Sequence, residues 1–319
     1  MNNSQWKWQN NRTALSAHPI YFKNRPELIP GIPDHALVLA VPVIAYWAYS
    51  LFFHALDMSG WKWLDKYRIH DSAEVKLRNR ATRLQVVRAV IFQQVIQTIL
   101  GVWWMDGAED VSTADHAIRL QTLAPTVERV LRSAVGNDLA HSLMDHSGAD
   151  ILYVVYWWAI PIAQFLFAMF IIDTWQYFLH RAMHVNKFLY KHLHSVHHRL
   201  YVPYAFGALY NHPLEGFLLD SLGAAIAEAL SCMTTRQAML LFGFSTLKTV
   251  DDHCGYRLPF DPLQWISTND ADYHDIHHQI IGIKSNFSQP FFVHWDVILG
   301  TRMTREDITL RRQKALKHD

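Results

Sequence analysis

Three long apolar runs dominate the first half of the chain. They cover residues 35–56 (HALVLAVPVIAYWAYSLFFHAL), 86–105 (VVRAVIFQQVIQTILGVWWM) and 151–173 (ILYVVYWWAIPIAQFLFAMFIID). A helix needs about 20 mostly apolar residues to cross a bilayer core of roughly 30 Å. The pattern therefore predicts three membrane-spanning helices, and Pro161 kinks the third without ending it.

A fourth apolar stretch, residues 214–250, is interrupted by polar residues. Its halves, GFLLDSLGAAIAEAL and AMLLFGFSTLKTV, are separated by SCMTTRQ, and each half is shorter than a full span. The pattern favours a helical hairpin that enters the membrane or packs against it over two complete crossings.

Charge in the loops predicts the orientation of the spans. The loop between the first two spans is basic, whereas the loop over residues 106–150 is mostly acidic. Because basic loops stay in the cytoplasm, the first loop is expected to be cytosolic and the second lumenal. Everything after residue 173 then faces the cytosol. The basic residues of the first loop are Lys62, Lys66, Arg68, Lys76, Arg78, Arg80 and Arg83.

These patterns predict an all-α fold, an integral membrane helical bundle with a cytosolic histidine-rich helical cap. Neither an internal repeat nor a glycine/serine linker divides the chain. The expected parts are an N-terminal polar segment (1–33), transmembrane anchor helices with their loops (34–173), a histidine-rich domain that includes the hairpin (174–305) and a basic tail (306–319).

Composition points to imidazole chemistry. The formal net charge of +1 over 319 residues gives no reason to expect nucleic acid as a partner. The two cysteines, Cys232 and Cys254, make neither a disulfide framework nor a CxxC pair. By contrast, the chain holds 20 histidines, and many of them lie in short motifs.

The histidine motifs have the spacing of metal ligands. His180 and His184 lie four residues apart, which places them on one face of the helix that continues out of the third span. Two HxxHH triplets follow, and on a helix we expect the first and the last two histidines of each triplet to point the same way. The triplets are His194, His197 and His198, and His274, His277 and His278.

Eight imidazoles brought together without a ligand would be costly to desolvate, or would repel one another once protonated. Ligation by imidazole without thiolate suits iron, copper, nickel or zinc. Zinc is usually satisfied by four ligands, so this number of histidines implies two ions, and the HExxH motif of zinc hydrolases is absent. Two redox-active ions beside a membrane can activate dioxygen to attack an unactivated C–H bond of a lipid.

Further residues complete this hypothesis. His212 and His253 lie at the edges of the apolar hairpin, and we add both to the ligand set because ten ligands serve two ions better than eight. Carboxylates are expected to fix the orientation of the rings, with Asp275 the first to test. Glu215 or Asp251 could pair with a substrate ammonium, or act as a helix cap or ring partner. The candidate ring partners are Asp173, Asp252, Asp272 and Asp275.

At these residues the sequence resembles the fatty acid hydroxylase superfamily of membrane di-iron oxygenases, which includes sterol desaturases and sphingolipid hydroxylases. Within the superfamily it looks most like the sphinganine C4-hydroxylases of fungi and plants. The resemblance is close over about residues 150–305, and the stretches YNHPLEGFLLD, TVDDHCG and NFSQPFFVHWD carry the narrower likeness. Thr249 stands where the family often has a histidine, so His212, a water molecule or another group must fill that place.

The resemblance implies a monooxygenase of the endoplasmic reticulum membrane, with its active site facing the cytosol. It would hydroxylate carbon 4 of sphinganine or dihydroceramide, giving phytosphingosine or phytoceramide. Two iron ions would be the cofactor, and zinc can replace iron during purification. Electrons would come from NAD(P)H through a separate reductase and cytochrome b5, because the chain has no haem-binding HPGG. The catalytic histidines would be His180, His184, His194, His197, His198, His253, His274, His277 and His278.

Two other functions stay open from the sequence. A sterol desaturase or methyl oxidase of the same superfamily would use the same histidines. A histidine-rich membrane metal transporter would carry polar ligands inside its spans, whereas here the histidines follow the spans.

Overall fold

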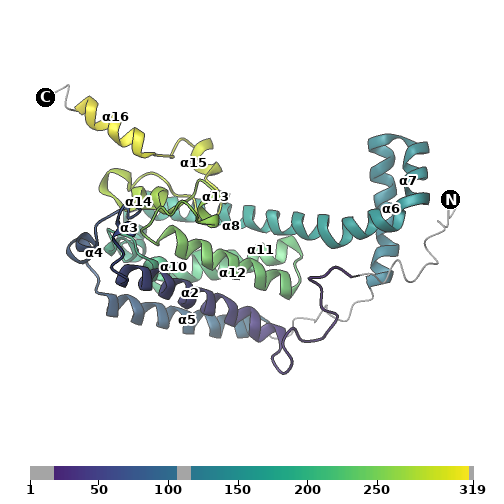
Figure 1. The fold of residues 1–319 in the computed structure, drawn as a ribbon, viewed down its shortest axis with the longest axis horizontal. Coiled ribbons are helices and arrows are strands. Elements are labelled where there is room, and N and C mark those ends of the chain that lie inside the picture. Colours follow the sequence, from purple (N-terminus) through teal and green to yellow (C-terminus); the bar gives the residue numbers. More distant parts are fainter. Residues whose placement is uncertain (1–17, 106–115, 316–319) are drawn as a thin grey trace. The chain divides into compact units, whose positions relative to one another are not determined.

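A computed structural model of the chain describes residues 18–105 and 116–315 (Figure 1). Within these ranges the fold is all-helical and contains no β-strand, as the sequence predicts. Part of the N-terminal polar segment (1–17), the end of the basic tail (316–319) and the acidic residues over 106–115 lie outside the described residues.

The chain divides into two compact units. The first comprises residues 1–34 and 107–166, and the second residues 35–106 and 167–319. The division into an anchor (34–173) and a hydroxylase domain (174–305) stays a prediction.

The first unit contains a helical hairpin that the sequence pattern did not reveal. Helices α6 (His116–Val135) and α7 (Asn137–Val154) occupy most of residues 106–150, the segment that the sequence analysis placed between the second and third spans. Both helices are amphipathic: Leu120 and Ala124 of α6 pack against Met144 of α7. A search for long apolar runs overlooks helices that bury only one stripe.

All three predicted spans are helical. The helices long and apolar enough to cross a membrane are Asp34–Met58 (α2), Arg83–Trp104 within α5 (Arg83–Met105), and a continuous stretch of 49 residues, Asn137–Val185. That stretch joins α7, the π-helix η3 (Val155–Ala159) and α8 (Ile160–Val185). It is about twice the length that a bilayer core requires, so α8 has residues to spare beyond the membrane.

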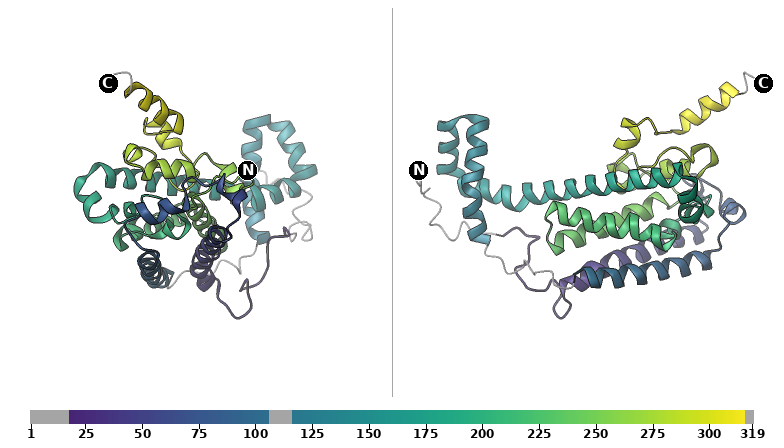
Figure 2. Two further views of the ribbon diagram at one scale, coloured as in Figure 1. Left: turned by 60° about the vertical axis from the view of Figure 1, so that its left-hand side comes forward. Right: turned by 180° about the vertical axis from the view of Figure 1, so that it is seen from behind.

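In the second unit, α2 and α5 lie side by side, and α11 (Gly223–Ser231) and α12 (Thr235–Asp252) form a second pair (Figures 1 and 2). α11 follows α10 (Pro213–Gly216) and the π-helix η7 (Phe217–Leu222). Residues 214–250 thus form the expected hairpin. Its turn is set by Cys232, which takes a left-handed conformation after α11, and by Thr234, which caps α12 through a capping box with Gln237.

Short helices form the rest of the second unit. They are α3 (Lys62–Asp65), α4 (Ser72–Arg78), α9 (Lys187–Leu189), η4 (Tyr190–His194), η5 (His197–Arg199), η6 (Ala205–Leu209), α13 (Pro262–Ile266), α14 (Ala271–His278), η8 (Ile280–Gly282), α15 (His294–Ile298) and α16 (Arg305–Ala315).

An aromatic core joins these short helices to the spans. Tyr46 and Phe53 of α2 are fully buried and belong to one apolar cluster with Phe206 of η6. Full burial of such a side chain contributes about 1.5–3 kcal/mol. The Tyr46 hydroxyl donates to the carbonyl of Phe206 at 2.7 Å, and Trp47 Nε1 donates to Gln94 of α5 at 2.9 Å. These contacts fix α2 against η6 and against α5.

Candidate metal centre

Nine histidines from separate segments of the second unit converge in two groups. Within each group the nitrogen atoms able to bind a metal all lie within 4.8 Å of one another. The first group is His180, His184, His194, His198 and His277, and the second is His197, His253, His274 and His278. The groups adjoin, because the ring centroids of His198 and His278 are 4.7 Å apart.

Each HxxHH triplet is divided between the two groups. His194 and His198 belong to the first group and His197 to the second; the other triplet is divided in the opposite sense, with His277 alone in the first. The expectation that all three histidines of a triplet point the same way was therefore wrong. At 100° per residue, positions i+3 and i+4 fall on opposite sides of position i and diverge by about 100°.

Local helix geometry widens this division in the first triplet. The chain is a π-helix over Tyr190–His194 and a 3-10 helix over His197–Arg199. The change from a wide to a tight turn inside HLHSVHH separates the ring of His197 from those of its neighbours. The second triplet lies on the regular helix α14.

Backbone carbonyls orient most of the rings. A carbonyl oxygen only accepts hydrogen bonds, so the Nδ1 atom facing it carries the hydrogen and the Nε2 atom of the neutral ring is a bare lone pair. The pairs are His180 with Phe287 (2.9 Å), His197 with Tyr210 (3.2 Å), His253 with Thr249 (2.8 Å), His277 with Ser285 (2.7 Å) and His278 with Leu200 (2.8 Å).

The bare lone pairs then face one another. In the second group, Nε2 of His197 and Nε2 of His253 are 3.5 Å apart, although both rings have their hydrogen on Nδ1. Nε2 of His277 is buried without a hydrogen-bond partner. Facing lone pairs repel unless a cation lies between them. The donor set therefore fits bound metal ions.

The spacing of the nitrogen atoms agrees with this interpretation. In the first group, Nε2 of His194 lies 3.0 Å from Nε2 of His180 and 3.0 Å from Nε2 of His198. Two nitrogen ligands about 2.1 Å from one ion and at right angles to each other are about 3.0 Å apart. The rings are thus separated as ligands of a shared ion would be.

Burial keeps these rings neutral. It lowers the pKa of His197 to about 4 and that of His253 to about 3, with nearby imidazoles adding to the effect at His253. Burial also lowers the pKa of His277 to about 3. Neutral imidazole is the form that binds metals, so the site is prepared for a cation at ordinary pH.

Glu215 is the carboxylate that contacts a ligand ring. Its Oε1 atom lies 2.5 Å from Nδ1 of His194, and both side chains are almost completely buried. A carboxylate in this position orients the ring and raises its basicity. The sequence suggested Glu215 only as a substrate contact, a helix cap or one of several ring partners.

The other predicted carboxylates make different contacts. Asp275 binds His70, Gln279 and Arg305. It adjoins His274 on α14, so it points about 100° away from that ligand. Asp173 accepts from the backbone N–H groups of Phe291 and Phe292, Asp252 pairs with Lys248, Asp251 accepts from Gln264, and Asp272 pairs with Arg305.

The structure does not bring His212 into either group. Its Nδ1 atom accepts from the backbone N–H of Leu214 at 3.2 Å, which makes it the cap of α10. Thr249, in the position of the missing family histidine, supplies the carbonyl that orients His253. The second group therefore has four imidazoles and the first has five.

The loop over residues 285–287 positions two ligand rings. In the sequence, the stretch NFSQPFFVHWD served only as a sign of family resemblance. Ser285 and Phe287, whose carbonyls hold His277 and His180, flank Asn286. Asn286 has a positive φ of 56° and is fully buried, and its side-chain amide donates to the carbonyls of Tyr273 and Met303. Asn tolerates this conformation better than most residues. The NFS motif thus fixes ligand orientation, and ligand spacing alone gives no signal of it.

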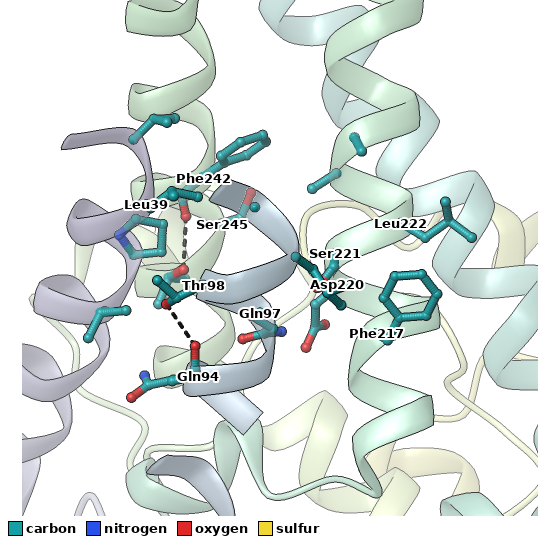
Figure 3. Close-up of a pocket in the computed structure, with 18 of the residues that line it drawn as sticks. Leu39, Gln94, Gln97, Thr98, Phe217, Asp220, Ser221, Leu222, Phe242 and Ser245 are labelled. Atoms are coloured by element: carbon teal, nitrogen blue, oxygen red, sulfur yellow. Dashed lines mark hydrogen bonds between the residues drawn. The ribbon is translucent and has the colours of Figure 1, made fainter. Parts of the chain in front are cut away.

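A cavity of about 320 Å³ lies among the helices of the second unit (Figure 3). Leu39, Phe217 and Phe242 give it apolar walls, and Gln97 and Asp220 point toward each other across it. The cavity begins close to the histidines. Its lining includes Gln176 and Thr249, and each lies one turn before a ligand of its own helix, His180 and His253 respectively.

Comparisons with known proteins agree with this site. Residues 165–301 match the family model described as fatty acid hydroxylase. The chain is 44% identical to the sphingolipid C4-hydroxylase of Saccharomyces cerevisiae, over 95% of this chain and 82% of the relative. It is 44% identical to that of Schizosaccharomyces pombe (87% and 92%) and to sphinganine C4-monooxygenase 2 of Arabidopsis thaliana (85% and 88%). No solved structure matches the chain. The chain belongs to the fatty acid hydroxylase family.

Proposed function

We propose that this protein is a sphingolipid C4-hydroxylase, a membrane monooxygenase that converts sphinganine or dihydroceramide to phytosphingosine or phytoceramide. The observation that carries the proposal is the position of the two histidine groups at one end of a lipid-sized cavity among membrane helices. Three relatives that each match most of the chain are named as C4-hydroxylases or a sphinganine C4-monooxygenase; two others of similar coverage are named as very-long-chain aldehyde decarbonylases.

The nine histidines fit two metal ions, and we propose iron for both. Five imidazoles would hold one ion and four the other, which leaves room for exogenous ligands. When bound, the irons supply the activation of dioxygen that no side chain provides.

Residues of the chain orient the ligand rings and exclude water from the reacting carbon. The carbonyls of Phe287, Ser285 and Tyr210 hold ring hydrogens on Nδ1, and so keep Nε2 of the ligands turned inward. Glu215 does the same for His194. The apolar walls of the cavity bind the hydrocarbon tail at about 25 cal/mol per Å² of buried surface and exclude water from the reacting carbon.

Electron delivery and location are part of the proposal. We propose that electrons come from NAD(P)H through a reductase and cytochrome b5. The site would face the cytosol from the endoplasmic reticulum membrane. The excess of basic residues between the first two spans supports this orientation, because basic loops remain cytosolic.

Product analysis in cells that cannot make phytosphingosine tests the function. Expression of the chain should restore phytosphingosine or phytoceramide, detected by mass spectrometry. The His277→Ala variant should insert into membranes but form no product. Oxidation of added sterol intermediates without any 4-hydroxylated sphingoid product would overturn the proposal in favour of a sterol oxidase.

A further inference from the structure

The cavity carries charge of one sign only. Among the described residues that line it, the ionisable side chains are Asp220 and Glu228, and none is Lys, Arg or His. The rest of the lining is apolar apart from amides and hydroxyls such as Gln97 and Ser221. A carboxylate in such surroundings has lost much of its hydration, and a bound cation would compensate for that loss. The same charges would oppose a fatty acid or a phosphate.

Of these two acids, Asp220 is the nearer to the metal centre along the chain. It lies in the wide helix η7, five residues after Glu215 of α10, and the two carboxylates influence each other electrostatically. Glu215 in turn contacts the ligand ring of His194. Glu228 lies eight residues beyond Asp220, about 12 Å at 1.5 Å per residue, and therefore well away from the histidines.

Neutral amides lie beside the Asp220 carboxylate. Nε2 of Gln93 donates to its Oδ2 atom at 3.3 Å. Figure 3 shows Gln97 and Asp220 pointing toward each other from α5 and η7, inside the cavity. An amide brings no positive charge, so the carboxylate has no counter-ion among the described residues here, and burial raises the pKa of Asp220 to about 7. A cation bound in the cavity would favour its charged form.

We infer that Asp220 binds the ammonium group of a long-chain amino alcohol, so that the preferred substrate is the free sphingoid base rather than its N-acylated form. This inference rests on the proposed function and narrows it. In the free base the amine is on carbon 2, two carbons from the carbon that is hydroxylated. The group that holds the amine must therefore lie within about one helical turn of the metal centre. Asp220, five residues from the carboxylate that contacts His194, fits this condition better than Glu228, which lies eight residues further along the chain.

N-acylation removes the positive charge. A dihydroceramide presents a neutral amide, which gains little from a carboxylate and adds a second hydrocarbon chain to the volume that the cavity must hold. A sterol is likewise neutral. We expect charge near the metal centre to discriminate among these lipids, because burial of apolar surface favours the binding of all of them.

The test compares Asp220→Asn with Glu228→Gln in the full-length, iron-loaded protein in detergent micelles. Both substitutions remove one carboxylate from the same cavity with little change of shape. We expect Asp220→Asn to raise KM for sphinganine about tenfold or more, and Glu228→Gln to change it little, because only Asp220 pairs with the ammonium. Asp220→Glu should recover part of the affinity. Iron content should be the same in all variants, which shows that each has folded.

A binding measurement gives a readout that does not depend on turnover. Trp103 and Trp104 line the cavity, so their fluorescence should report ligand entry. Octadecylamine and octadecanol share a chain and differ in charge. The unmodified protein and Glu228→Gln should bind the amine about tenfold tighter than the alcohol, or about 1.4 kcal/mol, and Asp220→Asn should lose the difference.

The outcomes separate this inference from the proposed function. If Asp220→Asn keeps both its preference for the amine and its KM for sphinganine, the inference is wrong even though the protein remains a C4-hydroxylase. If amine binding depends on Asp220 but no sphingoid base is hydroxylated, the amine site is confirmed and the proposed C4-hydroxylase function is wrong. Faster turnover of dihydroceramide than of sphinganine by the unmodified protein would also overturn the inference.

Discussion

Replacement of Glu215 by Gln should weaken the binding of one metal ion and leave the binding of the other unchanged. The Glu215 carboxylate accepts from Nδ1 of His194 at 2.5 Å, with both side chains almost fully buried. Hydrogen bonds to charged groups contribute about 1.5–3 kcal/mol, which corresponds to roughly a 10- to 150-fold change in an equilibrium constant. Gln keeps the acceptor and the shape but removes the charge, so its effect should lie toward the lower end of this range.

The division of the histidines into two groups predicts which ion the variant should bind more weakly. His194 belongs to the group of five, whereas the four rings of the other group are oriented through different contacts. Glu215→Gln should therefore lower the affinity of the first ion about tenfold, and Glu215→Ala should lower it further because the ring hydrogen of His194 then loses its acceptor.

Chelator titration followed by elemental analysis measures this effect. The unmodified protein should lose its ions over one range of chelator concentration, and Glu215→Gln should lose one ion per chain at about tenfold lower concentration. Glu228→Gln, in the same hairpin, is the matched control and should behave like the unmodified protein. If both ions are bound more weakly by the same factor, or if the metal affinity of Glu215→Ala is unchanged, the role assigned to the Glu215 carboxylate is refuted.

Five further substitutions test other parts of the structure. His212→Asn should retain both ions and activity, since Asn also caps helices well; loss of an ion on elemental analysis would restore His212 as a ligand. His197→Ala and His198→Ala, although adjacent, should deplete different ions, which metal-selective spectroscopy would resolve; depletion of the same ion would contradict the division of the triplet. Asn286→Ala should lower stability by about 2–3 kcal/mol in thermal or denaturant unfolding, because three buried hydrogen bonds of the side chain are lost and Ala tolerates a positive φ less well than Asn. The carboxylate partners of His70 raise its pKa, so its stabilising contribution should be complete below pH about 6.5 and decline as pH rises through the folded pKa. His70→Gln should lack that decline in a pH series of unfolding temperatures; a decline unchanged by the substitution would exclude His70 as its source.

The sequence predicted those features that depend on spacing along one segment. The three spans are encoded by uninterrupted apolar runs, and the pair His180 and His184 by a four-residue interval on a helix. Both signals are local, so neither requires knowledge of the tertiary fold. The α6–α7 hairpin escaped the same reasoning because each helix buries only a stripe, such as Leu120 and Ala124 in α6.

Features that depend on long-range approach could not be predicted. Glu215 reaches His194 across 21 residues and Phe287 reaches His180 across 107, and nothing in the local pattern indicates either approach. Asp275 was preferred on proximity in sequence, but neighbours on a helix point in different directions. His212 was included to complete a ligand count, although its position before Pro213 is typical of a helix cap.

The histidine groups and the cavity share the same helices. His180 and Gln176 lie one turn apart on α8, and His253 follows Thr249 by one turn at the end of α12. The distance between these histidines and the near end of the cavity is therefore set by helical rise rather than by loops. A substitution that changes the size of the cavity near Trp103 should change which hydrocarbon chain lengths of the substrate fit, without changing which carbon is hydroxylated. The position of hydroxylation should depend instead on whatever anchors the polar head beside the histidines.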